Sequence, residues 1–254
     1  MSENSAARIK SVQTALAVIE TLYERDGARV DEVADAVDVS KSSAHRHLTT
    51  LERENYVVRE GDEYVLSLQF LELGDYVGGR KGIFRLAEPK VREIADETGE
   101  RAQFVVEEHG YVRYVHRATG DRAVKTTSGV GKRVRMHAVA AGKAILAELP
   151  EERVRNIIAE RGLPAFTEHT ITDEARLFEE LGDIRERGVA FADEELVEGL
   201  RAVGVLIRGS DDRVLGALTV AGPTHRLKDD VWREDIPNLL LGTANELELK
   251  IEYE

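Results

Sequence analysis

The sequence predicts an α+β protein in which a small, mainly helical N-terminal module precedes a larger module of antiparallel strands and flanking helices. Helix-spaced apolar residues dominate the first sixty positions, and a β-rich hairpin follows them. Farther along the chain, strand-like runs mix with amphipathic helices. A chain of 254 residues, 42% of them hydrophobic, is long enough for two domains. We expect these domains at residues 1–67 and 86–254, joined by a linker helix at 68–85.

The N-terminal elements follow from periodicity and capping. The stretch "IKSVQTALAVIETLYERDG" has apolar residues at helical spacing and stops at Gly27; these residues are Val12, Leu16, Ile19 and Leu22. "VDEVADAVDVS" repeats the pattern briefly, and Ser40 is a suitable N-cap for a third helix, "KSSAHRHLTTLEREN". Two β-rich runs then meet at Gly61 and Asp62. Helix, helix, turn, helix and hairpin is the order of a winged helix-turn-helix.

The third predicted helix has the chemistry of a DNA-contacting surface. No acidic residue occurs from Val39 to Leu51. If Ala44, Leu48 and Leu51 face the core, short hydroxyls and cations point outward near the helix N-terminus, where phosphates and base edges can be bound. We expect contacts to double-stranded DNA from this helix and from Arg59 on the wing; the helix residues are Ser40, Lys41, Ser42, Ser43, His45, Arg46 and Thr49. The alternative is an ordinary solvated helix surface.

Composition limits the remaining possibilities. The net charge is −13, and residues 1–60 carry 8 basic and 11 acidic side chains, so DNA binding must depend on a local patch. Only 9 of the 35 basic residues are lysine, which we expect of a protein from a high-salt cytosol; an ordinary acidic bacterial protein is the alternative. The absence of cysteine excludes disulfides and thiolate zinc sites. No apolar run approaches the ~20 residues of a membrane span, and "MSENSAARIK" does not resemble a signal peptide, so we expect a cytoplasmic protein.

The second half predicts an antiparallel sheet with helices around it. "RAQFVVEEHGYVRYVHRAT" is a hairpin that turns at His109 and Gly110, and "RAVKTTSGVGKRVRM" is extended and basic. Three helices follow, "HAVAAGKAILAEL", "EERVRNIIAERG" and "TDEARLFEELGDIRERG", the last with Thr172 as its cap. "LRAVGVLIRGSDDRVLGALTVAGP" is a second hairpin, and a C-terminal helix ends the chain. This arrangement fits a small-molecule sensor domain.

Several apparent chemical motifs in this half are incomplete. Gly142-Lys143 lacks both the earlier glycine and the following Ser or Thr of a phosphate loop, so its small neighbours instead suit close helix packing or a pocket wall. The run Asp193 to Glu195 has no His-x3-His pair for a metal, and no Gly-x-Ser-x-Gly elbow occurs. We expect no enzyme activity, metal or cofactor. We expect His109 and His116 to be plain polar residues, and Trp232 to pack in the last domain.

Three stretches together resemble the IclR family of transcriptional regulators: "VSKSSAHRHLTTLE", "HAVAAGKAILA" and "RERGVAFADEELVEGLRAVGVLI" running to "VLGALTVAGP". The resemblance extends over almost the whole chain. It implies a winged helix, a linker helix and a GAF-like effector domain. It also implies a homodimer or homotetramer that binds palindromic operators.

The resemblance further implies a small-molecule effector that is an organic acid, an aromatic acid or a sugar-derived metabolite. By position, the implied effector-binding residues are Met136, Ala140, Ala141, Ala192, Asp193, Ala202, Thr219 and Ala221. Relatives often carry an acid in place of Ala192, and Cys or Ser in place of Ala202 and Ala221. We therefore expect backbone N–H groups, Thr219 and Arg201 to orient the ligand. Two alternatives stay open: a DNA-binding oligomeric scaffold without a ligand, and an enzyme localised by its DNA module.

Overall fold

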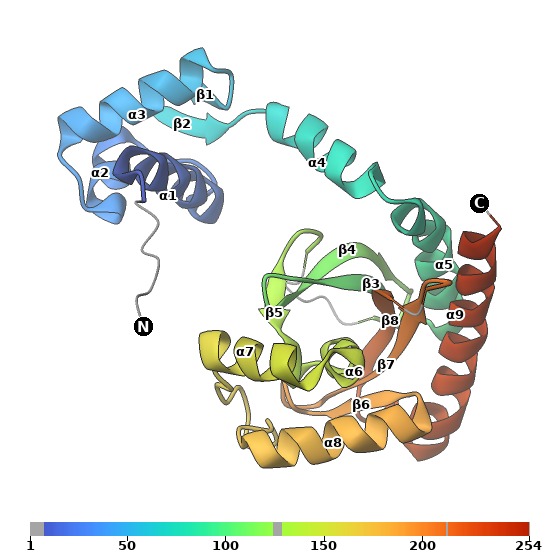
Figure 1. Cartoon of the computed structure of the whole chain (residues 1–254). Helices are drawn as coiled ribbons and strands as arrows, with labels where there is room; N and C mark the ends of the chain where they lie inside the picture. The colour runs from blue at the N-terminus through green and yellow to red at the C-terminus, as the bar shows by residue number, and fades with distance from the viewer. Residues whose placement is uncertain (1–7, 124–128, 212, 254) are drawn as a thin grey trace. The chain divides into compact units, whose positions relative to one another are not determined.

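The computed structural model describes residues 8–123, 129–211 and 213–253. The chain divides into two compact units, with the division between Val77 and Gly78. The first unit is helical with one hairpin, and the second is built on an antiparallel sheet with helices, which confirms the predicted α+β class (Figure 1).

The first unit forms a winged helix-turn-helix. Over its described residues it contains α1 (Lys10–Arg25), α2 (Val30–Val37), α3 (Lys41–Arg53), β1 (Val57–Glu60) and β2 (Glu63–Leu66). The two strands pair in antiparallel register around the predicted turn at Gly61 and Asp62. One small core joins these elements, with Val18, Leu22, Ala44, Leu48 and Val57 among its buried residues.

The apolar spacing in α1 predicted the helix correctly, but it does not mark the buried face. Val18, Thr21 and Leu22 are the buried residues of α1. Val12 and Leu16 are about half exposed, at 52% and 55%. The helix therefore carries apolar side chains on two faces, and only one of them packs in this unit.

Two helices follow the hairpin, α4 (Gln69–Gly79) and α5 (Gly82–Thr98). The break between them, at Arg80 and Lys81, falls inside the segment 68–85 that was predicted as one linker helix. The described residues of α4 include none that is buried, whereas α5 contributes Ile83, Phe84, Val91 and Ile94 to the core of the second unit. The helix that follows the break is therefore part of the sheet domain.

The second unit is built on a six-stranded antiparallel sheet. Its described strands lie in the order β5-β4-β3-β8-β7-β6. Their bounds are β3 (Arg101–Glu108), β4 (Tyr111–Thr119), β5 (Arg133–Arg135), β6 (Ala190–Asp193), β7 (Leu200–Arg208) and β8 (Val214–Pro223). The turn at His109-Gly110 falls where the sequence predicted it, and β7 and β8 form the second predicted hairpin. Part of the predicted extended segment before β5, residues 124–128, lies outside the described residues.

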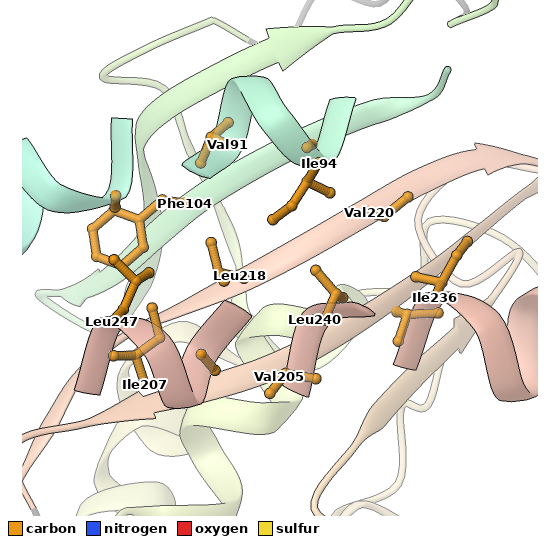
Figure 2. Packing of buried hydrophobic residues seen from close by; sticks show 14 of the residues in the cluster. Val91, Ile94, Phe104, Val205, Ile207, Leu218, Val220, Ile236, Leu240 and Leu247 are labelled. Carbon is orange, nitrogen blue, oxygen red and sulfur yellow. The ribbon is translucent and has the colours of Figure 1, made fainter. Parts of the chain in front are cut away.

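One face of this sheet packs against α5 and α9 (Ile236–Glu252). Figure 2 shows Phe104 and Leu218 from the sheet meeting Val91 and Ile94 of α5, with Leu240 and Leu247 of α9 on the same face. A short π-helical segment, Val231–Asp235, precedes α9 and buries Trp232, as predicted.

The other face packs against α6 (Ala140–Glu148), α7 (Glu151–Arg161) and α8 (Glu174–Arg187), shown in Figure 1. A Cβ atom on Gly204 of β7 would lie 2.5 Å from the Ala141 nitrogen, and one on Gly142 would lie 2.2 Å from the Met136 carbonyl oxygen. Glycine at position 204 lets α6 approach the sheet this closely, and glycine at position 142 lets α6 pack against the Met136 backbone just before it. The prediction of close helix packing in this segment is confirmed.

Two local predictions were wrong. Asp173, not Thr172, caps α8, because its carboxylate accepts a hydrogen bond from the Arg176 backbone nitrogen at 2.9 Å. His116 is not a plain surface residue, because its Nε2 lies 2.6 Å from the carbonyl oxygen of Phe84 and links β4 to α5. Burial lowers the pKa of His116, and the hydrogen bond to Phe84 partly offsets this effect.

Candidate functional site

The third helix presents its polar side chains to solvent. Lys41, Ser42, His45 and Arg46 are exposed, and Ser43 and Thr49 are half-buried. On the opposite side, Ala44 and Leu48 are fully buried. The predicted core side of α3 is therefore confirmed for these two residues, and the predicted DNA-contacting side chains share the outward surface.

The start of α3 is held by its cap. The Ser40 hydroxyl accepts a hydrogen bond from the Ser43 backbone nitrogen at 3.2 Å and lies 3.1 Å from the Ser42 hydroxyl. This cap fixes the orientation of the first turn, where the helix dipole favours anions. Lys41 lies 3.8 Å from Asp31 of α2, but both side chains remain more than half exposed.

The wing residue Arg59 is exposed on β1. Its Nε donates to the Gly61 carbonyl oxygen at 3.0 Å, and its guanidinium lies 5.8 Å from the centre of the Tyr64 ring. These contacts hold the side chain beside the hairpin turn. The predicted DNA-contacting residues, those of α3 and Arg59 on β1, therefore all lie in the first unit.

A cavity of about 170 Å³ lies in the second unit, between the sheet face that carries α6 and the loop after β6. This is smaller than the roughly 300–1,000 Å³ of drug-sized ligand sites, so it suits a small metabolite. Much of its lining is alanine from α6, from the segment just before it and from the strands: Ala138, Ala140, Ala141, Ala192, Ala202 and Ala221. The α6 N-terminus has no side-chain cap.

Most of the sequence-predicted effector residues line this cavity. They are Ala140, Ala141, Ala192, Arg201, Ala202, Thr219 and Ala221. Met136 lines a separate small cavity instead, and Asp193 does not line the alanine-rich one. The Thr219 hydroxyl donates a hydrogen bond to the Val203 carbonyl oxygen of β7 at 2.6 Å, so its proton is already used within the sheet.

The Arg201 guanidinium is bound elsewhere. Successive side chains of a strand point to opposite faces, and Arg201 is adjacent to cavity-lining Ala202. The guanidinium donates to both Asp193 carboxylate oxygens, at 2.8 and 3.2 Å, and lies 4.2 Å from the centre of the Trp232 ring. These hydrogen bonds raise the pKa of Arg201. Its charge is therefore paired with Asp193 rather than directed into the cavity.

Three polar side chains in the cavity wall were missed by sequence reasoning. They are Arg101 and Gln103 of β3 and Tyr114 of β4. Arg101 is 7% exposed and Gln103 is 4% exposed. Within the described part of the chain, neither the Gln103 amide nor the Tyr114 hydroxyl forms a hydrogen bond. The i, i+2 spacing of Arg101 and Gln103 could have placed them on one face, but nothing in the sequence said which face.

The pKa shifts of this wall reflect burial and adjacent positive charge. Burial lowers the pKa of Arg101, and the neighbouring guanidinium of Arg117 lowers it further. Burial raises the pKa of Tyr114, and the charges of Arg101 and Arg117 oppose that rise. Two cations therefore lie close together at the β3 and β4 side of the cavity.

A buried ion pair closes another side of the cavity. Lys143 of α6 is 1% exposed, and its Nζ lies 2.6 Å from Glu195 Oε1 and 3.4 Å from Glu180 Oε1. Arg187 also donates to Glu180, at 2.8 Å. The Glu195 carbonyl oxygen accepts from the Thr170 hydroxyl at 2.6 Å, so the loop after β6 is fixed at both backbone and side chain.

Burial raises the pKa of Glu195, and Lys143 opposes that rise. The Asp193 backbone also lowers this pKa. Lys143 is therefore the main group that stabilises the Glu195 carboxylate.

Two other kinds of site were sought in the described residues. No group of three or more His, Cys, Asp or Glu side chains there is placed to hold a metal ion. In the same residues, no helix has the length and apolar character needed to cross a bilayer.

A winged helix-turn-helix joined to a sheet domain with a small cavity defines a class: two-domain, DNA-binding transcriptional regulators. The family comparisons are specific. The model "Bacterial transcriptional regulator IclR C-terminal" matches residues 76–249, and "IclR helix-turn-helix domain" matches residues 11–61. The chain therefore belongs to the IclR family of transcriptional regulators, with an N-terminal helix-turn-helix and a C-terminal effector-binding domain.

Relatives of known sequence or structure match nearly the full chain. A Halobacterium salinarum protein named "Probable HTH-type transcriptional regulator ArcR" is 30% identical over 249 residues, covering 96% of this chain and 95% of the relative. The crystal structure of Thermotoga maritima IclR has a TM-score of 0.78 at 26% identity, covering 96% and 98%. An IclR homologue from Microbacterium hydrocarbonoxydans complexed with 4-hydroxybenzoate has a TM-score of 0.82 at 23% identity, covering 96% and 100%.

Proposed function

We propose that this protein is a ligand-responsive transcriptional regulator that binds a palindromic operator as a homodimer or homotetramer. The observation that carries this proposal is the combination, in one chain, of an exposed α3 that bears cations and hydroxyls with a cavity large enough for a small metabolite. A ligand that binds better to one arrangement of the DNA-binding units shifts the population toward it.

The proposed DNA contacts depend on a few side chains of α3 and the wing rather than on bulk charge. Arg46 and Ser42 are exposed on the outward surface, and the chain as a whole is strongly acidic. The test is binding to the DNA upstream of its own gene, measured in molar salt. Arg46→Ala and Ser42→Ala should weaken sequence-specific binding, with Glu20→Ala on the exposed side of α1 as a control. Unchanged binding in both α3 variants would show that α3 is not the recognition helix.

An exposed apolar stripe on α1 supports the proposed dimer. The stripe consists of Ile9, Val12, Leu16, Ile19 and Tyr23, at alternating spacings of three and four residues. All but Ile19 are more than half exposed. This is the spacing of a helix seam that packs on a partner helix, and a two-fold pair would present two recognition helices to successive half-sites.

Light scattering tests this interface. Leu16→Asp should convert the oligomer to a smaller species, because a charge cannot be buried in an apolar seam without a large cost. Glu20→Gln, also on the exposed surface of α1, is the matched control. If Leu16→Asp leaves the mass unchanged, α1 does not form the dimer interface.

The proposed effector is a small organic acid, an aromatic acid or a sugar-derived metabolite. The cavity size supports a small ligand, and the structure of the Microbacterium homologue with 4-hydroxybenzoate supports an acid. A thermal-shift screen of metabolites tests the proposal, since a ligand that binds the native state raises its stability. The alternative, an oligomeric scaffold without a ligand, predicts that no metabolite in a broad screen raises the midpoint.

We also propose that the protein works in a salt-rich cytoplasm. The low lysine content and the net charge of −13 support this, as does the similarity to a Halobacterium protein. The melting temperature should rise as KCl increases to molar concentration. A maximum at low salt would contradict this adaptation.

A further inference from the structure

A second acid-free stretch lies in the second unit. No acidic residue occurs from Arg122 to Ala147, which is the longest such run in a chain that carries 48 acidic residues. The run over α3, from Val39 to Leu51, is shorter. The first part of the longer run is the extended, basic segment predicted from the sequence. Its arginines belong neither to α3 nor to the lining of the alanine-rich cavity.

The end of this run pairs with β4 as a two-stranded ribbon at the edge of the six-stranded sheet (Figure 1). In this pairing, Arg133 of β5 lies opposite Arg113, and Arg135 lies opposite Tyr111. Residues directly opposite each other, and residues two apart on one strand, share one side of a sheet. Tyr111 and the three arginines therefore occupy the same side of the ribbon.

Three guanidiniums gather around the Tyr111 ring. Those of Arg133 and Arg135 lie 4.9 and 5.1 Å from the ring centre. The guanidinium of Arg161, at the C-terminal end of α7, lies 4.9 Å from the same centre, and its Nε donates to the His109 carbonyl oxygen at 3.0 Å. The aromatic face attracts cations but does not neutralise them. We call this group the arginine ribbon; it consists of Tyr111, Arg113, Arg133, Arg135 and Arg161.

Neighbouring carboxylates balance only part of this charge. Glu108 and Glu160 each pair with one arginine of the ribbon, at 3.3 and 3.5 Å. Within the described part of the chain, neither Arg133 nor Arg135 forms an ion pair. The Nη1 atom of Arg135 is covered and has no hydrogen-bond acceptor there. The arginine ribbon is therefore a locally positive surface on a chain with a net charge of −13.

The shape of this surface does not suit a small ligand. The cavity that Arg135 and Arg161 line has a volume of about 10 Å³, which is room for about one water molecule. Over residues 111–123 and 129–135, Val130 is the only large apolar side chain that is exposed. The ribbon thus lacks the apolar centre that is typical of protein interfaces. An extended polyanion, which needs neither a pocket nor an apolar surface, fits better.

Duplex DNA is the extended polyanion that matches the proposed function. It carries one negative charge per about 1.7 Å of helix axis, and two residues of a strand span about 7 Å, so Arg133 and Arg135 together face about four phosphates. A guanidinium can donate two parallel hydrogen bonds to a phosphate. Because the first unit binds the duplex in the same chain, a second contact forms at a high effective concentration.

Building on the proposed operator binding, we propose that the arginine ribbon binds the sugar–phosphate backbone of the duplex DNA that flanks the operator. In this proposal α3 reads the operator sequence, and the ribbon adds backbone contacts that do not depend on sequence. Arg133 and Arg135 contribute most, because their charges are not already paired with a carboxylate. The protected length of DNA is then longer than the operator itself.

Duplexes of two lengths test this proposal on the full-length protein. One contains the operator alone, and the other extends it on each side by about two helical turns of arbitrary sequence. Binding is measured over the KCl range in which circular dichroism shows a folded protein. The wild type should bind the extended duplex more tightly. Its plot of log K against log salt should also be steeper for that duplex, by about 0.9 for each added phosphate contact.

Variants locate the added contacts. Arg133→Gln combined with Arg135→Gln should reduce the advantage of the extended duplex by about 4- to 25-fold at the lowest salt, about 2- to 5-fold for each arginine. Binding of the short duplex should stay at the wild-type level. Arg92→Gln combined with Arg213→Gln is the matched control, because it removes the same charge from two exposed arginines of the second unit that are already paired with carboxylates.

Two further measurements complete the test. Hydroxyl-radical footprinting should show protection of the flanking backbone by the wild type and by the control, but not by the double ribbon variant. Light scattering without DNA should give the double variant the same mass as the wild type. If the double variant does not fold, as judged by Trp232 fluorescence, the single variant Arg133→Gln decides the question, because its side chain is exposed.

The outcomes separate this inference from the proposed function. Equal Kd values of the wild type for both duplexes, or an advantage that the double variant retains or the control also loses, would overturn the ribbon assignment while leaving operator binding in place. A changed mass of the double variant without DNA would also overturn it, because the ribbon would then join copies of this chain. If neither duplex is bound at all, the proposed operator binding itself fails, and the ribbon assignment fails with it.

Discussion

Replacing Lys143 by methionine removes the only cation within bonding distance of the Glu195 side chain among the described residues. Lys143 is 1% exposed, and the Glu195 side chain is 9% exposed, so neither charge is well hydrated. Glu180 keeps Arg187 at 2.8 Å and is more exposed, so Glu195 is the carboxylate left unpaired. Breaking a buried pair from one side costs about 3–5 kcal/mol, and we expect about 3 kcal/mol here because Glu195 can take up a proton instead.

Urea unfolding followed by Trp232 fluorescence measures this loss, because the only tryptophan of the chain lies in the second unit. A loss of this size lowers the midpoint by about 1–2 M urea. The double variant Lys143→Met with Glu195→Leu should recover most of it, since an apolar replacement of a buried pair is close to neutral. Lys250 forms an exposed ion pair with Glu246 on the same helix, so the control variant Lys250→Met should change stability by less than about 1 kcal/mol.

The pH dependence has a defined sign. Burial already raises the folded-state pKa of Glu195 above its usual 4.5, so the folded state binds more protons than the unfolded state in the window above 4.5. Stability therefore falls as pH rises through that window and is flat above the folded pKa. Removing Lys143 raises the folded pKa further, so the loss in Lys143→Met should be smaller at pH 5 than at pH 8. An equal loss at both pH values, or a double variant less stable than the single one, would refute the ion-pair reasoning.

Three further predictions follow from other contacts. Gly204→Val places a side chain against the Ala141 backbone, where a Cβ already lies at 2.5 Å, so it should cost at least about 3 kcal/mol and abolish ligand-induced thermal shifts. Ser40→Ala should destabilise the first unit by about 1 kcal/mol and accelerate amide exchange in the first turn of α3, whereas Ser67→Ala should leave that exchange unchanged. Trp232→Phe should weaken the stacking of Arg201 and lower stability, measured by circular dichroism; no change would show that this contact contributes nothing.

The sequence predicted the elements well where one physical signal decided them. Ser40 marked the start of α3 because a hydroxyl there satisfies a free backbone nitrogen. His109 and Gly110 marked the first hairpin because both adopt positive φ in the turn. Apolar spacing found α1 but not its buried face, because Val12 and Leu16 fit the helical period as well as Val18 and Leu22 do. A period alone cannot tell which face packs in the domain and which is left for another contact.

The cavity was predicted in part for a similar reason. Its alanine lining follows from the family motifs, and most of those positions line the cavity. Arg201 was expected to orient the ligand, but strand alternation turns it away from Ala202 and toward Trp232. Arg101 is distant in sequence from every motif, and only the pairing of β3 with β8 brings it beside Ala221. Such long-range pairing is not encoded in any local pattern.

The most direct test of the central claim is an operator-binding titration with and without an effector. A fluorescent duplex from the DNA upstream of the gene is titrated with the full-length protein in molar KCl, first alone and then with a metabolite that raises the melting temperature. A regulator that couples its cavity to its DNA-binding units predicts a change in Kd of about 5- to 150-fold in the presence of the metabolite. A metabolite that binds the cavity and leaves this Kd unchanged would contradict the account.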